Sequence, residues 1–241
     1  MRFSASKAGL LKSCKFPFRP GTPCVDERGR AAINGDRFHK AIATYIETGV
    51  RPVETGRPLK WLEDRMDHAT AWVDKNRRPE WRVEIAYAYQ WRTGEARILG
   101  SNLGREYAAA GLKDDEIAGS ADLVWLAGDT VVCADHKTGR SVTDAVWAQL
   151  EVLCLMAAKA HGARHACARI LHATDYGIVE YERHFDELQL WSAAEQLKMD
   201  LAEIPEAWPE YGPHCSGCYC PARAGCELFQ IRSKEEHHDA A

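Results

Sequence analysis

Residues 117–139 read IAGSADLVWLAGDTVVCADHKTG, and this stretch decides the fold. Two segments rich in β-forming residues, 117–126 and 130–135, flank a short turn that contains a glycine. This pattern predicts an antiparallel β-hairpin. Asp122 lies on the first strand and Asp135 on the second, so we expect strand pairing to place the two carboxylates side by side.

The segments on both sides of the hairpin alternate between helical and strand patterns. Ser4 or Ser6 can cap a first helix, and residues 20–33 carry the breakers of a loop. A third helix opens at Pro58 and ends before Pro79. The other expected elements are helices at 4–14, 34–48, 143–160 and 185–204, and strands at 81–91, 95–100, 117–126, 130–135, 165–173 and 178–183. Together they predict an α/β fold with a mixed sheet flanked by helices.

The composition places the chain among ordinary globular proteins. It has 241 residues, a formal net charge of −4, 46% hydrophobic residues and 27% charged residues, which excludes a disordered chain and a histone-like basic one. No apolar run is long enough to span a membrane, and Lys7 and Lys12 interrupt any secretory signal. We therefore expect one domain over 1–241, ending in a tail at 231–241, in the cytoplasm.

The acid–lysine pair on the second hairpin strand points to a reaction. Asp135 and Lys137 lie two residues apart, so both side chains point to one face of the strand. Asp122 and Asp135 on that face would repel each other unless a divalent cation lay between them. A lysine beside the cation can position a water, help to remove its proton and offset charge that builds on a phosphate. An isolated acid-x-lysine pattern is more often a solvated ion pair, but the upstream acid, the hairpin and the following helix favour phosphodiester hydrolysis.

Several motifs together resemble the PD-(D/E)xK nuclease superfamily, in particular its RecB-like branch. Residues 119–122 resemble the G-x-x-D motif of that branch, and residues 135–139 resemble its D-x-K-T-G motif. Gln149 stands where the Gln-x-x-x-Tyr motif begins, although Leu153 replaces the tyrosine and its DNA contact. Residues 35–39, GDRFH, resemble the upstream helix that can add a histidine to the metal site.

This resemblance runs over residues 4–226 and implies a restriction-endonuclease-like sheet in a nuclease that depends on Mg²⁺ or Mn²⁺. Lys137 would orient the attacking water. The implied metal ligands are His39, Asp122, Asp135 and the backbone carbonyl of His136.

Three of the polar residues around these motifs have a plainer interpretation. A histidine such as His39 in an amphipathic helix is more often a partly buried structural residue than a metal ligand. Gln149 lies on an otherwise apolar helix and needs hydrogen-bond partners, so a structural bond and a contact with substrate or metal-bound water both stay open. Glu84 could add a further acid to the site, but a surface or structural role is the favoured interpretation.

The cysteines divide into groups. Four of the nine lie between 215 and 226, in a chain whose odd count and missing export signal argue against a disulfide framework. Intracellular cysteines at such spacings usually bind metal, and zinc or an iron–sulfur cluster would each take four of them. Cys133, Cys154 and Cys167 lie in apolar segments and are expected in the core, and Cys24 has no assigned role.

RecB-like nucleases of the iron–sulfur type offer a closer comparison, because they take one cysteine from the end of the first helix and three from a C-terminal segment. The family spacing fits either Cys218 or Cys220 as the middle ligand of the C-terminal segment, so this choice stays open. The implied [4Fe–4S] ligands are Cys14, Cys215, Cys226 and either Cys218 or Cys220. The cluster, or zinc as the alternative, would join segments 1–33 and 205–230.

The resulting hypothesis is a metal-dependent DNA exonuclease or end-processing nuclease of recombination, repair or phage DNA metabolism. Its expected substrate is DNA that is single-stranded or has free ends. Two alternatives stay open: a CRISPR-adaptation nuclease, and a non-catalytic DNA-binding subunit that keeps the fold. Recombination, phage or CRISPR-adaptation proteins would be the partners. A net charge of −4 predicts DNA binding by a local site, with an affinity that falls as salt rises.

Overall fold

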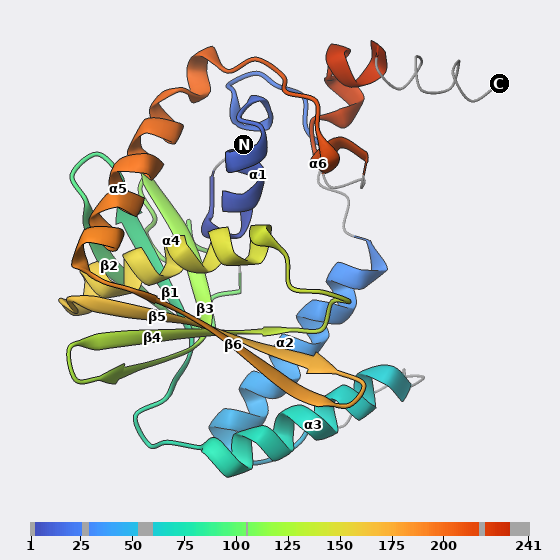
Figure 1. The fold of residues 1–241 in the computed structure, drawn as a ribbon, viewed down its shortest axis with the longest axis vertical. Coiled ribbons are helices and arrows are strands. Elements are labelled where there is room, and N and C mark those ends of the chain that lie inside the picture. Colours follow the sequence, from blue (N-terminus) through green and yellow to red (C-terminus); the bar gives the residue numbers. More distant parts are fainter. Residues whose placement is uncertain (1–2, 26–28, 53–59, 105, 217–219, 232–241) are drawn as a thin grey trace.

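The computed structural model describes residues 3–25, 29–52, 60–104, 106–216 and 220–231 (Figure 1). Its centre is a six-stranded sheet in the order β2-β1-β3-β4-β5-β6. The strands are β1 (Arg82–Gln90), β2 (Glu95–Ser101), β3 (Glu116–Ala127), β4 (Thr130–Lys137), β5 (His165–Thr174) and β6 (Gly177–Phe185). Only β4 and β5 pair in parallel, and helix α4 (Asp144–His161) makes the crossover between them. The mixed α/β sheet and the predicted hairpin are therefore confirmed.

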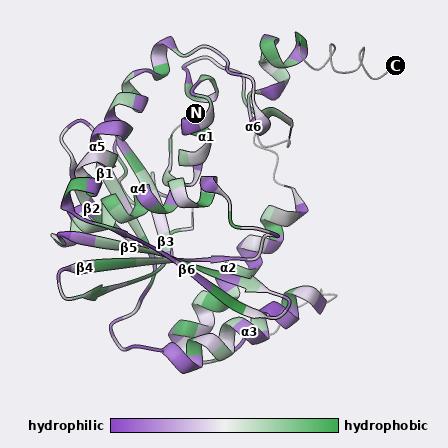
Figure 2. Ribbon diagram, viewed as in Figure 1, coloured by the Kyte–Doolittle hydropathy of each residue, from purple (hydrophilic) through white to green (hydrophobic). Residues whose placement is uncertain are grey.

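Helices cover both faces of the sheet (Figure 1). One face carries α1 (Ala8–Ser13), α4 and α5 (Glu187–Ala202), and the other carries α2 (Arg30–Thr48) and α3 (Lys60–Asn76). Each layer encloses a hydrophobic cluster, which we call the α4-side core and the α2-side core. Figure 2 shows apolar residues along the central strands, where both cores meet the sheet.

Helix α4 is the most buried helix, as its nearly uniform apolar sequence predicts. Residues on several of its sides have little or no exposure, because the sheet, α1 and α5 surround it. The helix ends at Gly162, whose φ of 65° is the left-handed conformation that glycine adopts readily. The predicted core cysteines Cys133, Cys154 and Cys167 are buried in these layers.

The first two predicted helices differ from the structure at their boundaries. Helix α2 begins at Arg30 rather than at 34, because Gly29 has extended backbone and ends the loop there. The first helix is split into a 3-10 turn, η1 (Ala5–Lys7), followed by α1. Neither expected serine caps a backbone group there, because Ser4 Oγ and Ser6 Oγ bond to each other at 3.0 Å. Pro58 lies outside the described residues.

The N-terminal and C-terminal segments lie side by side (Figure 1). The backbone N–H of Val25 donates to the carbonyl of Pro221 at 2.8 Å. Lys15 Nζ lies 3.0 Å from Asp200 and 2.9 Å from Glu203, just beyond α5. These contacts join the N-terminal segment to the region that follows the sheet. Within the described ranges, no helix has the length and apolar character that crossing a membrane requires.

Candidate active site

Three carboxylates lie in one row across three neighbouring strands. The antiparallel register of β1 and β3 places Glu84 opposite Asp122. In the register of β3 and β4, Asp122 lies opposite Asp135, one position beyond the last paired residues. The hairpin thus brings the two predicted aspartates together, and the next strand adds a third acid.

Asp122 is fixed by donors from two elements. Its side chain is nearly buried, and Oδ2 accepts a hydrogen bond from the backbone N–H of His136 at 2.7 Å. Nδ1 of His39, from helix α2, lies 2.9 Å from the same oxygen. The His136 ring is buried against the ring of Phe38, with 6.4 Å between centroids. The helix therefore brings His39 to the site across a long sequence separation.

Asp135 and Lys137 form an ion pair on the α4 side of the sheet. Lys137 Nζ lies 2.7 Å from Asp135 Oδ2, and Asp135 itself is 1% exposed. Gln149 Nε2, from α4, lies 3.5 Å from the other carboxylate oxygen of Asp135. The amide that looked out of place on an apolar helix therefore has a partner within the site.

The electrostatic environment of His39 and Asp122 favours the charged form of both side chains. Burial alone would raise the pKa of Asp122, but His39 and His136 outweigh it and hold that pKa well below its ordinary value. Burial likewise opposes charge on His39, yet Asp122 raises the pKa of its imidazole to about 9. In the metal-free protein at neutral pH, the pair is an imidazolium and a carboxylate.

In the second pair, Asp135 and Lys137, burial and the neighbouring charges have opposing effects on each pKa. Burial raises the pKa of Asp135. The positive charge of Lys137 lowers that pKa, and repulsion from the Asp122 carboxylate raises it further. Burial disfavours the charged form of Lys137, but the carboxylates of Asp135 and Asp122 outweigh it, and the pKa of the lysine is raised. Lys137 is therefore an ammonium that is paired with the Asp135 carboxylate.

Glu84 lies beside Asp122 and is half-buried, so it is not the surface residue that was one of its two favoured interpretations. His39, Glu84 and Asp122 each offer a donor atom, and these three atoms lie within 4.8 Å of one another. Burial, and then repulsion from Asp122, raise the pKa of Glu84 to about 7. A sequence signal existed, because Glu84 is the one acid in the strand RVEIAYAYQ, whose neighbours are mostly apolar.

The donor set of this site fits a divalent cation. Carboxylate oxygens with one imidazole nitrogen are ligands that Mg²⁺ and Mn²⁺ accept. Glu84, Asp122 and Asp135 form a row of like charges with little exposure, a situation that proteins stabilise by protonation, by ion pairing or by a bound metal. The structure brings donor atoms of His39, Glu84 and Asp122 together for such an ion, and Asp135 lies opposite Asp122 on the next strand.

The position of the family tyrosine is not available for contacts with a ligand. Leu153 is fully buried in the α4-side core, and its Cδ2 lies against Gly119 of the G-x-x-D segment. A DNA contact made by a tyrosine here would need a different packing of α4 against β3.

The cysteines at the two chain ends form a group of free thiols. Cys14 and Cys215 are buried, and the backbone N–H of Glu210 donates to Cys14 Sγ at 3.5 Å. Burial raises the pKa of the Cys220 thiol, and Cys14, Cys215 and Cys226 raise it further. The four thiols are thus close enough to interact. No three of the described thiols lie mutually within 4.8 Å, and Cys218 lies outside the described residues.

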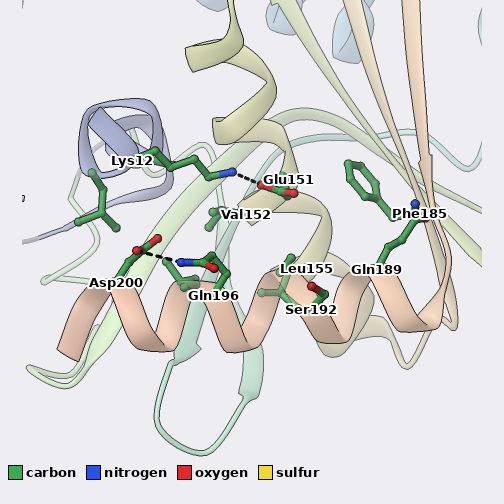
Figure 3. Close-up of a pocket in the computed structure, with 13 residues that line it drawn as sticks. Lys12, Glu151, Val152, Leu155, Phe185, Gln189, Ser192, Gln196 and Asp200 are labelled. Atoms are coloured by element: carbon green, nitrogen blue, oxygen red, sulfur yellow. Dashed lines mark hydrogen bonds and ion pairs between the residues drawn. The ribbon is translucent and has the colours of Figure 1, made fainter. Parts of the chain in front are cut away.

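Two further features lie elsewhere on the molecule. A cavity of about 310 Å³ lies between α1, α4 and α5, next to the Lys12–Glu151 ion pair (Figure 3). Its lining includes none of the carboxylates in the row. Cys167, Glu182 and His184 on β5 and β6 offer donor atoms within 4.8 Å of one another. Arg169 already pairs with Glu182, so a cation there would meet a like charge.

A family model described as the PD-(D/E)XK nuclease superfamily matches residues 2–227. No curated protein matches the chain. A solved structure titled "Crystal structure of SSO0001" is similar at 14% sequence identity, over 80% of this chain and 96% of that chain, with a TM-score of 0.35.

Proposed function

The chain belongs to the PD-(D/E)XK nuclease superfamily, which makes it a nuclease, and from this premise we propose a Mg²⁺- or Mn²⁺-dependent DNA exonuclease or end-processing nuclease. One observation carries the proposal: Asp122 and Asp135 lie opposite each other, with Lys137 paired to Asp135 and His39 paired to Asp122. We further propose that it acts in the cytoplasm, in recombination, repair or phage DNA metabolism.

The protein groups divide the work of an in-line displacement at phosphorus. A divalent ion held by His39, Asp122, Asp135 and the backbone carbonyl of His136 would supply Lewis-acid stabilisation of phosphate charge and lower the pKa of water. The Lys137 ammonium, anchored by Asp135, positions the attacking water and offsets charge on the phosphate oxygens.

The bond changes are those of hydrolysis. The water oxygen forms a bond to phosphorus and gives up a proton, one bridging P–O bond breaks, and the leaving oxygen gains a proton. Gln149 holds the second oxygen of Asp135, which keeps that carboxylate from rotating as charge redistributes. We propose Gln149 as a positioning residue, because its amide contacts the Asp135 carboxylate.

A digestion assay tests this function. We expect the full chain with Mn²⁺ to shorten end-labelled single-stranded or double-stranded DNA, and Asp135→Ala or Lys137→Ala to reduce the rate by roughly 10²–10⁴-fold. Asp129→Ala on the exposed hairpin turn and Lys75→Ala on α3 are matched controls that should cleave normally. Full activity of both site variants would contradict the proposal. DNA binding without cleavage by the wild-type protein would favour the non-catalytic subunit instead.

We also propose a [4Fe–4S] cluster at the thiol group of Cys14, Cys215, Cys226 and either Cys218 or Cys220. Tetrahedral zinc holds its sulfur ligands at about 2.3 Å, so its thiolates lie about 3.8 Å apart. No three of the described thiols lie mutually within 4.8 Å, so they do not form a compact zinc site in this structure. Anaerobic purification, an absorption spectrum and metal analysis test this proposal. A colourless protein with stoichiometric zinc would remove the cluster and leave the nuclease proposal standing.

A further inference from the structure

Strand β1 changes the core that it faces at Glu84. Residues two apart on a strand normally share one face of the sheet. Val83 packs in the α2-side core, whereas Ile85 packs in the α4-side core. Glu84 lies between them with a φ of 50°, in the left-handed region that residues with a side chain rarely adopt. The irregular backbone therefore reverses the alternation of β1 at one acidic residue.

Strand β3 makes the same change at the residue opposite. Ala121 packs in the α4-side core and Leu123 in the α2-side core, so the alternation reverses at Asp122. The register places this reversal directly across from Glu84. Both carboxylates therefore lie at the boundary between the two cores, next to the end of the β3–β4 pairing.

The surroundings of Glu84 compensate its charge poorly. Ser120 Oγ donates a hydrogen bond to Glu84 Oε2 at 3.3 Å, which is long and comes from a neutral group. The neighbouring carboxylate of Asp122 repels it, and the attraction from His39, which is paired with Asp122, is smaller than this repulsion. A glutamate on a strained backbone beside another acid is unfavourable for the metal-free fold in two ways.

We propose that Glu84 is a further protein ligand of the divalent cation, together with His39 and Asp122. This rests on the proposed function, because it assigns a residue to the metal of the same site. The three donor atoms already lie within 4.8 Å of one another, and a carboxylate oxygen suits Mg²⁺ and Mn²⁺. A cation among these groups converts the repulsion between Glu84 and Asp122 into attraction of both to the metal.

Titration calorimetry with Mn²⁺ on the full chain tests the assignment without any DNA. We expect Glu84→Gln to raise the Kd for Mn²⁺ at least about tenfold, since changes to groups around metal sites typically cost 10- to 100-fold in affinity. Glu95→Gln is the matched control, because Glu95 is an exposed glutamate on the neighbouring strand β2. Its Kd should stay within about twofold of wild type.

A second variant separates a ligand from a structural residue. Glu84→Gly relieves the left-handed backbone, so we expect its unfolding midpoint in EDTA to equal or exceed that of Glu84→Gln. Its Mn²⁺ affinity should fall as far as that of Glu84→Gln. Lower midpoints for both variants, with wild-type Mn²⁺ affinity, would show a structural role and overturn the assignment.

The failure of this inference is distinguishable from failure of the proposed function. Loss of Mn²⁺ binding in Asp122→Asn, with wild-type binding in Glu84→Gln, would overturn the role of Glu84 alone. A wild-type protein that binds neither Mn²⁺ nor Mg²⁺ would overturn both.

Discussion

Gly119 on β3 lies so close to Leu153 on α4 that a Cβ at position 119 would stand 2.7 Å from Leu153 Cδ2. It would also stand 2.6 Å from the Cβ of Ala5. The glycine of the G-x-x-D segment is therefore required by the close approach of a helix and a turn. Its backbone φ is not among the positive values.

This contact predicts that Gly119→Ala destabilises the protein by about 1–3 kcal/mol, because overpacking displaces α4 or η1. Leu153→Ala in the same chain should recover part of the loss, which a double-mutant cycle of denaturant unfolding would measure. Gly139→Ala is a control, since a Cβ there would meet only Ser141 O at 3.8 Å. Equal stability of the Gly119→Ala and wild-type proteins would refute the packing argument.

The His39–Asp122 pair predicts a pH dependence of the metal-free fold. The pKa of His39 rises to about 9 from an ordinary 6.5. Its contribution to the free energy of unfolding is therefore complete below pH 6.5 and is lost as the pH rises through 9. The size is on the order of 3 kcal/mol, because one pKa unit corresponds to about 1.4 kcal/mol. We expect the stability difference between wild type and His39→Gln, measured by thermal unfolding in EDTA, to shrink between pH 6.5 and 9.5. A difference that stays constant or grows over this range would show that the pair is not ionised.

Gln149 predicts a catalytic loss with little loss of stability. Replacement by methionine keeps the volume in α4 but removes the amide that contacts Asp135. The contact is long, so we expect kcat to fall roughly tenfold, with KM for DNA and the unfolding midpoint nearly unchanged. Leu150→Ala, one position further on and fully buried, should show the opposite pattern, with a stability loss of about 2–5 kcal/mol. A KM effect alone for Gln149→Met would instead indicate contact with DNA.

The thiol group predicts a selective loss of bound metal. Cys14→Ser should lower the iron content of anaerobically purified protein to a small fraction of wild type, because it removes the only ligand proposed from the N-terminal segment. Cys24→Ser is the matched control: this thiol lies in the same segment but bonds to the carbonyl of Pro17 at 3.3 Å. Comparison of Cys218→Ser with Cys220→Ser would identify the fourth ligand. Equal iron content in Cys14→Ser and wild type would exclude Cys14 as a ligand.

The sequence by itself determined the central part of the fold. The turn at 127–129 fixed the hairpin, and the hairpin register fixed that Asp122 and Asp135 would meet, because antiparallel pairing around a short turn leaves little choice of partners. The apolar sequence of 143–160 likewise determined a helix surrounded by other elements. Both features arise from residues that are close in the sequence, so a local sequence pattern is enough to predict them.

Only the tertiary structure decided which other residues enter the site. His39 arrives from a helix far upstream, and its sequence pattern is equally suited to a structural histidine. Glu84 reads as one polar residue in an apolar strand until the β1–β3 register and its left-handed backbone bring it opposite Asp122. Long-range packing sets both positions, because α2 and β1 meet Asp122 through contacts between residues that are far apart in the sequence.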